Sequence, residues 1–203
     1  SGYLHAPLRD QDTTARQGLE HDAELARAFG FDATFIEQVP VVQRPGVRFA
    51  HQATFHPLRY LEPLVRAIPG DGSFVLAHTA LEAVDDAPMV VHAGGRTIRC
   101  TYVVIATHNP VMGKQGAVTA ALFQSKLALY TSYVLGARVP KGTVPDGLWW
   151  DTSDPYDYLR VDSHEDHDYV IFGGADVKTG QEDNAKHVFQ QLTERLHRLV
   201  PMA

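Results

Sequence analysis

The sequence predicts an α+β or α/β fold with several strands and few helices. Apolar residues repeat at helical spacing in three stretches of the 203 residues, at about 14–29, 57–68 and 182–199. Alternating or continuously apolar runs, which are typical of strands, stand out at 130–140, 156–162 and 168–176. No internal repeat, low-complexity tract or long linker interrupts this order.

The first helix is predicted by an apolar face at helical spacing, which we expect to be buried. The residues of this face are Leu19, Ala23, Ala26 and Phe29. Gly30 follows, and glycine readily adopts the left-handed backbone conformation that often ends a helix. The pattern therefore predicts a helix from about Thr14 to Phe29.

A second helix is predicted to begin at His56-Pro57, because proline in the first turn is already in a helical conformation. Its apolar residues at helical spacing are Leu58, Leu61, Leu64, Val65 and Ile68. Pro63 is expected to kink the helix, since proline has no backbone N–H to donate. The run from Pro69 to Gly72 should end it.

The strands are expected in two groups. In the first group, short strands at 2–7 and 33–40 precede a loop that contains Pro45 and Gly46. The second group begins with a strand at 73–84 and continues with 88–107, where a hairpin turns at Gly94-Gly95 and leads into a buried strand.

The last third of the chain should form a hairpin followed by a helix. The polar run SHEDHD (163–168) is predicted to be the exposed turn that joins two strands. Its histidines and carboxylates suggest a metal site, but zinc ligands must converge in a tetrahedron, usually from more than one element. We therefore expect no metal. The inward residues of the final helix should be Val188, Phe189, Leu192, Leu196 and Leu199.

Composition excludes several classes of partner. The formal net charge is −6 and no basic patch is present, so a nucleic-acid partner is not expected. The single cysteine, Cys100, excludes an internal disulfide and a multi-cysteine metal site, and it favours a reducing cytoplasm. No apolar run approaches the roughly 20 residues that span a bilayer, and no signal peptide is recognisable. The chain begins at Ser1 without an initiator Met, so we expect a segment of a longer polypeptide.

Five segments, taken in order, carry a resemblance to a known family. They are GYLHAP (2–7), HQATFHPLRYLEPL (51–64), VVIATHNP (103–110), LWWDTSDPYDYLRVD (148–162) and YVIFGGADVKTGQ (169–181). Together they resemble the D-amino-acid-oxidase-like family of FAD-dependent oxidoreductases. The nearest branch is the bacterial members that often carry a C-terminal Rieske domain. The resemblance covers nearly the whole chain.

The resemblance implies a mixed β-sheet substrate domain of the D-amino-acid-oxidase type plus part of an FAD-binding Rossmann-like domain. Residues 1–50 and 110–203 would form the two parts of the substrate domain, and residues 51–109 would belong to the FAD domain. The sequence pattern places breaks at similar points, near Phe55 and Pro110.

One departure from the family concerns the cofactor. The chain has no GxGxxG turn, whose amides hold the pyrophosphate of a dinucleotide, and it lacks the later glycine-rich segment beside the flavin. It therefore resembles the middle of such an enzyme, and we do not expect it to hold FAD stably by itself.

The resemblance places four residues near FAD. In such flavoproteins a strand ending in Ala-Thr-Gly lies beside the dinucleotide, because small residues allow the backbone to approach. Ala106 and Thr107 match this pattern, and His108 stands where glycine is usual. The backbone of Leu81 would lie near the adenine. For residues 103–110 the alternative is a buried strand with a polar exit, and for Leu81 the alternative is a core residue of its own strand.

Tyr158 and Arg160 are the candidate substrate-binding residues. They are two apart on a predicted strand and so share a face. A Tyr hydroxyl and an Arg fork suit a substrate carboxylate, because Arg can bind both oxygens. The resemblance places Tyr158 on a strand facing the flavin. The alternative is a strand face that packs on a neighbour.

Other residues have open alternatives. His56 either faces the cofactor or caps the second helix, and we favour the cap. His51 and Gln52 lie on the crossover between domains and could reach the site. Trp149-Trp150 could line an apolar pocket or pack in the core.

The resemblance implies that the complete protein is an FAD-dependent oxidoreductase that oxidises a C–N bond of an amino acid or amine. Its partners would be that small substrate and an electron acceptor, for which a Rieske domain is one candidate. We name no catalytic base, because none is needed if the free amine reacts. The alternative is a non-catalytic, flavin-free module for substrate binding or oligomerisation.

Overall fold

The computed structural model describes residues 1–8, 14–106, 129–181 and 184–203. These residues form two compact units, which are described separately below. Unit 1 comprises Ser1–Thr54 and Tyr130–Ala203, and unit 2 comprises Phe55–Leu129. Mixed sheets and three described helices agree with the predicted α+β class. Whether the units are the substrate and FAD domains is a prediction that the fold alone does not test.

Unit 1 is built on a seven-stranded mixed sheet of strand order β2-β3-β1-β8-β9-β10-β7. The strands are β1 (Gly2–His5), β2 (Ala33–Ile36), β3 (Gly46–Phe49), β7 (Tyr130–Pro140), β8 (Leu148–Asp151), β9 (Tyr158–Ser163) and β10 (His167–Lys178). The pairs are antiparallel except for β1 and β8, which run parallel. This parallel pair joins the two stretches of sequence that make up the unit.

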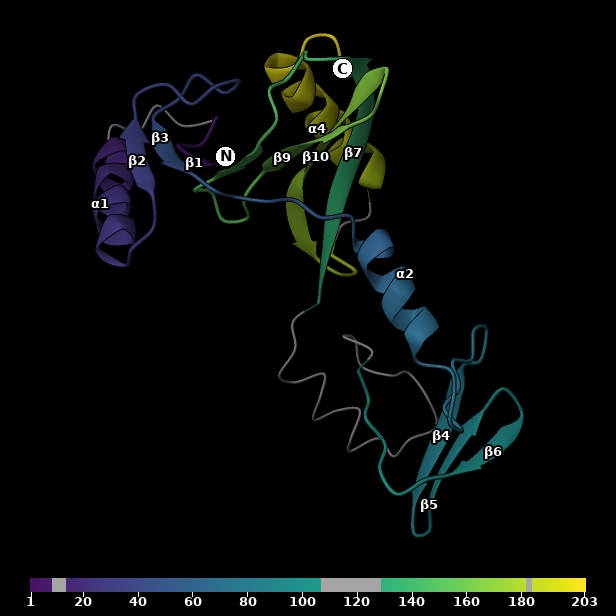
Figure 1. Cartoon of the computed structure of the whole chain (residues 1–203). Coiled ribbons are helices and arrows are strands. Elements are labelled where there is room, and N and C mark those ends of the chain that lie inside the picture. The colour runs from purple at the N-terminus through teal and green to yellow at the C-terminus, as the bar shows by residue number, and fades with distance from the viewer. Residues whose placement is uncertain (9–13, 107–128, 182–183) are drawn as a thin grey trace. The chain divides into compact units, whose positions relative to one another are not determined.

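Two helices lie at the two ends of this sheet (Figure 1). They cover opposite faces, because their clusters contain Tyr3 and Leu4, successive residues of β1. Helix α1 (Thr14–Ala28) packs on β2 and β3 through a small cluster that includes Leu19, Ala23 and Val47. Helix α4 (Ala185–Leu199) packs on β10 and β7 through a larger cluster. No helix in the described part of the chain is long and apolar enough to cross a membrane.

The main core lies between α4 and the sheet. Trp149 is 1% exposed, and its indole stacks on Tyr3 and donates from Nε1 to the Pro40 carbonyl at 2.9 Å. The other fully buried residues of this cluster include Val39, Val139, Leu159, Val161, Val170, Phe172, Leu192 and Val200. Burial of these side chains is the main contribution to the stability of unit 1.

Several predicted elements of unit 1 are confirmed. The strand at 130–140 is β7, and the turn at 163–168 joins β9 to β10, with the His164 N–H donating to the His167 carbonyl at 2.9 Å. Gly30, at φ +86°, ends α1 as expected. Strands β3 and β8 were not predicted, because each has only four residues and pairs with the distant β1 as well as with a neighbour in sequence.

Three details of unit 1 were predicted wrongly. The strand predicted at 33–40 ends at Ile36, where pairing with the short β3 stops. Phe29 was assigned to the buried face of the first helix but is 75% exposed, because the helix ends at Ala28 and Phe29 lies in the turn. In the final helix, Val188, Leu192 and Leu196 are buried as expected, whereas Phe189 is 39% exposed.

Unit 2 contains helix α2 (Pro57–Ala67) and a three-stranded antiparallel sheet in the order β4-β5-β6. The strands are β4 (Leu81–Asp86), β5 (Met89–Ala93) and β6 (Arg96–Arg99). The hairpin that turns at Gly94-Gly95 is confirmed. The strand predicted at 73–84 is wrong in its first half, since β4 begins only at Leu81.

The buried strand predicted to end at Thr107 is also absent as far as the structure describes it. Residues 101–106 are not in a strand, and Tyr102 and Val104 are 84% and 86% exposed. A central strand needs neighbours on both sides, and no described strand pairs with this stretch. Thr107 and His108 lie outside the described residues.

Helix α2 forms as predicted, and Pro63 lies within it. His56 is its N-cap: Nδ1 accepts from the Arg59 N–H at 3.4 Å. Its apolar residues repeat at helical spacing, yet no residue of α2 is buried. The described sheet of unit 2 therefore does not cover the apolar face of α2.

We predict that Gly46→Ala destabilises unit 1. Gly46 lies in β3, which pairs with β1. A Cβ at Gly46 would come within 3.0 Å of the Leu4 carbonyl oxygen and of a Val39 methyl group. The free energy of unfolding should fall by about 1–3 kcal/mol, the usual cost of overpacking. Urea denaturation measures the change.

Gly18→Ala is the matched control. Gly18 lies in α1, and nothing lies within 4 Å of an added Cβ. Alanine should raise the free energy of unfolding by about 0.5–1 kcal/mol, because it favours the helix. Equal effects of the two substitutions would contradict the close contact at Gly46.

Candidate functional site

One face of the large sheet is left open by the helices of unit 1. Helix α4 covers the other face at β10 and β7, and α1 covers this face only at β2 and β3. The side chains on the uncovered part, here called the open face, are Trp150, Tyr158, Arg160, Asp162, Ile171, Tyr169 and Val134. Tyr169 and Val134 are 39% and 44% exposed, so this face is accessible within the unit.

Tyr158 and Arg160 both lie on the open face, as their spacing predicted. Tyr158 is opposite Trp150 on one side and Gly173 on the other, and its ring fills the space that a side chain at Gly173 would need. Burial raises the pKa of the Tyr158 phenol, and Tyr156 and Asp176 raise it further. The phenol therefore stays protonated and can donate a hydrogen bond.

Arg160 is held by a neighbour on the same strand. Its Nη2 donates to Asp162 Oδ2 at 2.7 Å, and the two side chains are 26% and 31% exposed. Arg160 lies opposite Leu148 on β8 and Ile171 on β10, so its neighbours in the sheet on both sides are apolar. Asp162 occupies one nitrogen of a group with five N–H donors, so Arg160 keeps donors for a second anion.

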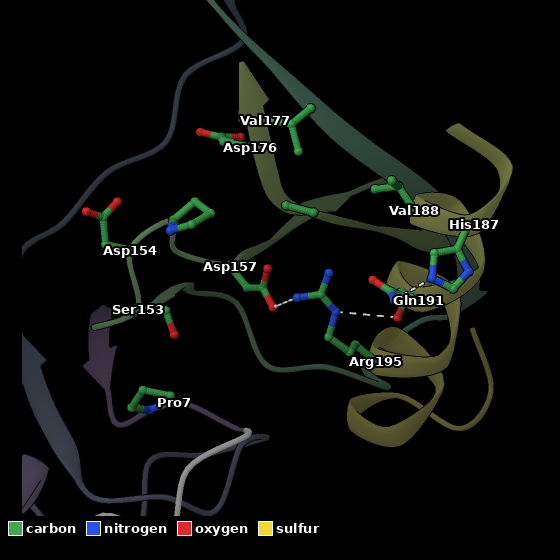
Figure 2. Close-up of a pocket in the computed structure, with 12 residues that line it drawn as sticks. Pro7, Ser153, Asp154, Asp157, Asp176, Val177, His187, Val188, Gln191 and Arg195 are labelled. Carbon is green, nitrogen blue, oxygen red and sulfur yellow. Dashed lines mark hydrogen bonds and ion pairs between the residues drawn. The ribbon is translucent and has the colours of Figure 1, made fainter. Parts of the chain in front are cut away.

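A separate pocket of about 500 Å³ lies past the ends of β1 and β8 (Figure 2). Its polar walls are Ser153, Asp154, Asp176, His187 and Gln191, with Pro7 and Val188 as apolar walls. Neither Tyr158 nor Arg160 lines it. The pocket and the open face are therefore two distinct places in unit 1.

An ion pair between helix α4 and the sheet forms the inner wall of this pocket. Arg195 reaches from α4 and its Nη1 contacts Asp157, with the two residues 5% and 7% exposed (Figure 2). Asp157 is positioned in turn by Asp151, whose Oδ1 accepts from the backbone N–H groups of Ser153 and Asp157 at 3.0 and 3.1 Å. The arrangement fixes α4 to the end of the sheet.

His5 is buried beside this network. It is 4% exposed, lies opposite Asp151 in the parallel pair, and its Nδ1 hydrogen-bonds the Ala6 carbonyl at 2.8 Å. Burial lowers the pKa of His5, although the Ala6 hydrogen bond and the charge of Asp151 oppose the shift. His5 is therefore neutral near pH 7 and serves to hold the backbone.

The turn at 163–168 is polar and exposed. The rings of His164 and His167 stack with their centroids 4.7 Å apart, and His167 Nδ1 lies 2.5 Å from Asp166 Oδ1. No group of three or more His, Cys, Asp or Glu side chains in the described part of the chain is arranged to hold a metal ion.

His51 and Gln52, the two residues of the predicted crossover, lie in different surroundings. His51 is largely exposed, and its Nε2 is 3.8 Å from Asp32. Gln52 lines an apolar groove together with Trp150, whose ring stacks on Phe49. Trp149 is a core residue, so the pair Trp149-Trp150 divides between core and groove.

The described residues do not fit a self-sufficient FAD site. Leu81 begins β4 and is partly buried, while Ala106 is exposed and outside any strand. In the described part of unit 2, α2 is the one helix whose N-terminus could hold a phosphate. There Pro57 has no N–H, and the His56 side chain already accepts from Arg59.

Asp162, Asp157 and Arg195 were not predicted as site or pocket residues. The alternation of the strand would have found Asp162, because it continues the series Tyr158, Arg160 on one face. No sequence signal joins Asp157 to Arg195, which are 38 residues apart and meet only when α4 packs.

Comparison with known proteins identifies the class. The family described as FAD dependent oxidoreductase matches residues 1–203. The chain therefore belongs to this family of FAD-dependent oxidoreductases, as its sequence resemblance predicted.

A particular relative is the "Putative Rieske 2Fe-2S iron-sulfur protein YhfW" of Bacillus subtilis (strain 168). The two are 25% identical over 180 residues, which cover 87% of this chain and 34% of the relative. The chain thus spans about a third of that relative's length. No solved structure matches the chain.

We predict that Arg195→Met lowers the free energy of unfolding by about 3–5 kcal/mol, because it leaves the Asp157 carboxylate buried without its cation. The double variant Asp157→Asn, Arg195→Met should recover part of this loss. Urea denaturation of both single variants and the double variant gives the coupling. Strictly additive effects would contradict a direct pair.

Proposed function

We propose that unit 1 supplies the substrate-binding surface of an FAD-dependent oxidoreductase that oxidises a C–N bond of an amino acid or amine. The observation that carries this proposal is the placement of Tyr158 and Arg160 together on the open face. The family match over residues 1–203 supports the reaction class. The choice of an amino acid or amine rests on the chemistry of these two side chains.

Arg160 would bind the carboxylate of an amino acid. Its side chain is about three-quarters buried, and a charge-assisted hydrogen bond in such a place is stronger than in water. Asp162 holds the side chain in place and limits the rotamer freedom lost on binding. The protonated Tyr158 phenol would donate a second hydrogen bond to the same substrate.

The domain assignment belongs to this proposal. Residues 1–50 and 110–203 would form the substrate domain, and residues 51–109 part of the FAD domain. Unit 1 and unit 2 divide the chain at Thr54 and Tyr130, which is compatible with the first boundary and places the second further along.

FAD would be held jointly with further segments of a longer polypeptide. Leu81, Ala106, Thr107 and His108 are the residues of this chain that we assign to its surroundings. The flavin would supply the electron acceptor for the oxidation. A relative named as a Rieske iron–sulfur protein suggests a Rieske centre as the next electron carrier.

A second candidate is a flavin-free module for substrate binding or oligomerisation. The observation that favours it is the missing phosphate-binding turn, both in the sequence and at the N-terminus of α2. This candidate keeps the open face as a binding surface but assigns no redox reaction to the protein.

FAD retention separates the two candidates. The 203-residue chain and the complete polypeptide that contains it are each incubated with FAD, passed through gel filtration and examined by visible absorption. We expect flavin bands in the complete polypeptide alone. Bands in neither protein would leave only the flavin-free module.

Arg160→Ala in the complete polypeptide should raise KM for an amino acid by about 10- to 100-fold, because a charge-assisted hydrogen bond to the carboxylate is lost. KM for the amine with the same side chain but no carboxylate should not change. Arg160→Lys should restore part of the loss, since it keeps the charge without the fork. An unchanged KM for the amino acid would remove Arg160 from the site.

A further inference from the structure

We propose that the substrate carries a large apolar side chain, which lies in an aromatic groove next to the open face. The residues of this groove are Leu25, Ala26, Phe29, Phe31, Phe49 and Trp150, with Asp22 and Gln52 at its rim. The inference rests on the proposed function and adds the substrate class to it. It predicts an aromatic or long aliphatic amino acid or amine in place of a small or charged one.

The groove is an apolar surface of unusual exposure. Phe29, Phe31 and Leu25 are 75%, 59% and 47% exposed. The Phe49 and Trp150 rings stack with centroids 6.1 Å apart and planes 20° apart. The cavity measures about 360 Å³, which lies within the range of small-molecule sites. Exposed apolar surface of this kind usually marks a binding site.

Trp150 connects the groove to the proposed substrate residues. It lies directly opposite Tyr158 in the antiparallel pair of β8 and β9. On its other side, the indole reaches over Gly2 of β1, where an added Cβ would come within 3.1 Å of the ring. Because Gly2 has no side chain, the indole can extend across β1 and stack on Phe49 of β3.

Arg160 lies in the same row of the sheet as the far wall of the groove. The register aligns Arg160 with Leu148, Leu148 with Gly2, and Gly2 with Phe49. Trp150 is on the strand next to that of Arg160 but diagonal to it, and its ring lies over Gly2, two strands from Arg160. With strands about 4.8 Å apart and diagonal neighbours about 7–8 Å apart, the indole is roughly 7–10 Å from Arg160. A carboxylate on Arg160 and a side chain on Trp150 are within reach of one amino acid.

The polarity of the groove favours a substrate with a neutral side chain. Asp22 is the one charged residue in its lining, and a carboxylate there disfavours an acidic side chain. A charged side chain that is buried against three Phe rings and an indole would lack the hydrogen bonds that it needs. The groove therefore fits a neutral phenyl, indole or branched alkyl group.

The small size of the groove argues against a protein partner as occupant. Stable protein interfaces bury about 1,200–2,000 Å² in total with roughly 20–30 residues on each side, whereas eight residues line the groove. A second copy of the chain or another segment of the polypeptide is the competing occupant, and the experiment distinguishes it.

The experiment uses the complete, flavin-loaded polypeptide and two carboxylates that lack the reactive amine, 3-phenylpropionate and propionate. Isothermal titration calorimetry measures the affinity of each, and steady-state kinetics compares phenylalanine with alanine. We expect 3-phenylpropionate to bind about 10- to 100-fold more tightly, the range for burying one aromatic side chain. kcat/KM should favour phenylalanine by a similar factor.

Phe31→Ala tests the groove, and Met202→Ala is the matched control, since Met202 is another exposed apolar residue at 64% and lies outside the groove. Phe31→Ala should remove most of the phenyl preference, measured as the ratio of the two affinities and the ratio of the two kcat/KM values. Met202→Ala should change neither quantity.

Three results would distinguish a failure of the groove from a failure of the proposed function. Equal affinity for the two carboxylates, with alanine still oxidised, would overturn the groove and leave the proposed function standing. A Phe31-dependent phenyl preference without oxidation of any amino acid or amine would support the groove and overturn the proposed function. A change in sedimentation coefficient on Phe31→Ala, without a change in phenyl preference, would make the groove a protein interface and overturn the inference.

Discussion

The parallel pairing of β1 with β8 is the contact on which unit 1 depends. It joins residues 2–5 to residues 148–151, and hydrogen bonds at both ends, Leu148 N–H to the Ser1 carbonyl and Thr152 N–H to the His5 carbonyl, fix its register. Side chains alternate along these strands, so the register sends Tyr3 and Trp149 into the core under α4 and leaves Trp150 on the other face. A shift by one residue would bury the groove wall and expose the core tryptophan.

The same alternation places the stabilising residues on one face of the sheet and the proposed substrate-binding residues on the other. On the core face, Leu159 and Val161 pack beneath α4, and Arg195 closes the end of the sheet by pairing with Asp157. On the open face, Tyr158 and Arg160 are displayed by the strand that those core residues anchor. The substrate-binding residues that we propose therefore gain their rigidity from the opposite face of the strand, without using core positions themselves.

In the described part of unit 2, the helix and the sheet form without a shared core. Its hairpin forms from local turn chemistry, yet α2 buries no residue and the apolar stretch 101–106 pairs with no described strand. Both are elements that a parallel dinucleotide-binding sheet would accommodate between its layers. This agrees with a family relative about three times as long as the aligned region, and with the proposal that FAD needs residues from elsewhere.

The sequence by itself determined the helices, the strand β7, the hairpin of β9 and β10, the caps at His56 and Gly30, and the family. These features depend on periodicity, turn residues or ordered motifs, which are local in the chain. It also placed Tyr158 and Arg160 on one face. Only the tertiary structure decided the short strands β3 and β8, the pair Asp157–Arg195, and the groove built from α1, β3 and β8. Each of these joins residues distant in sequence, and no local pattern specifies which distant partner a four-residue strand or a buried charge will meet.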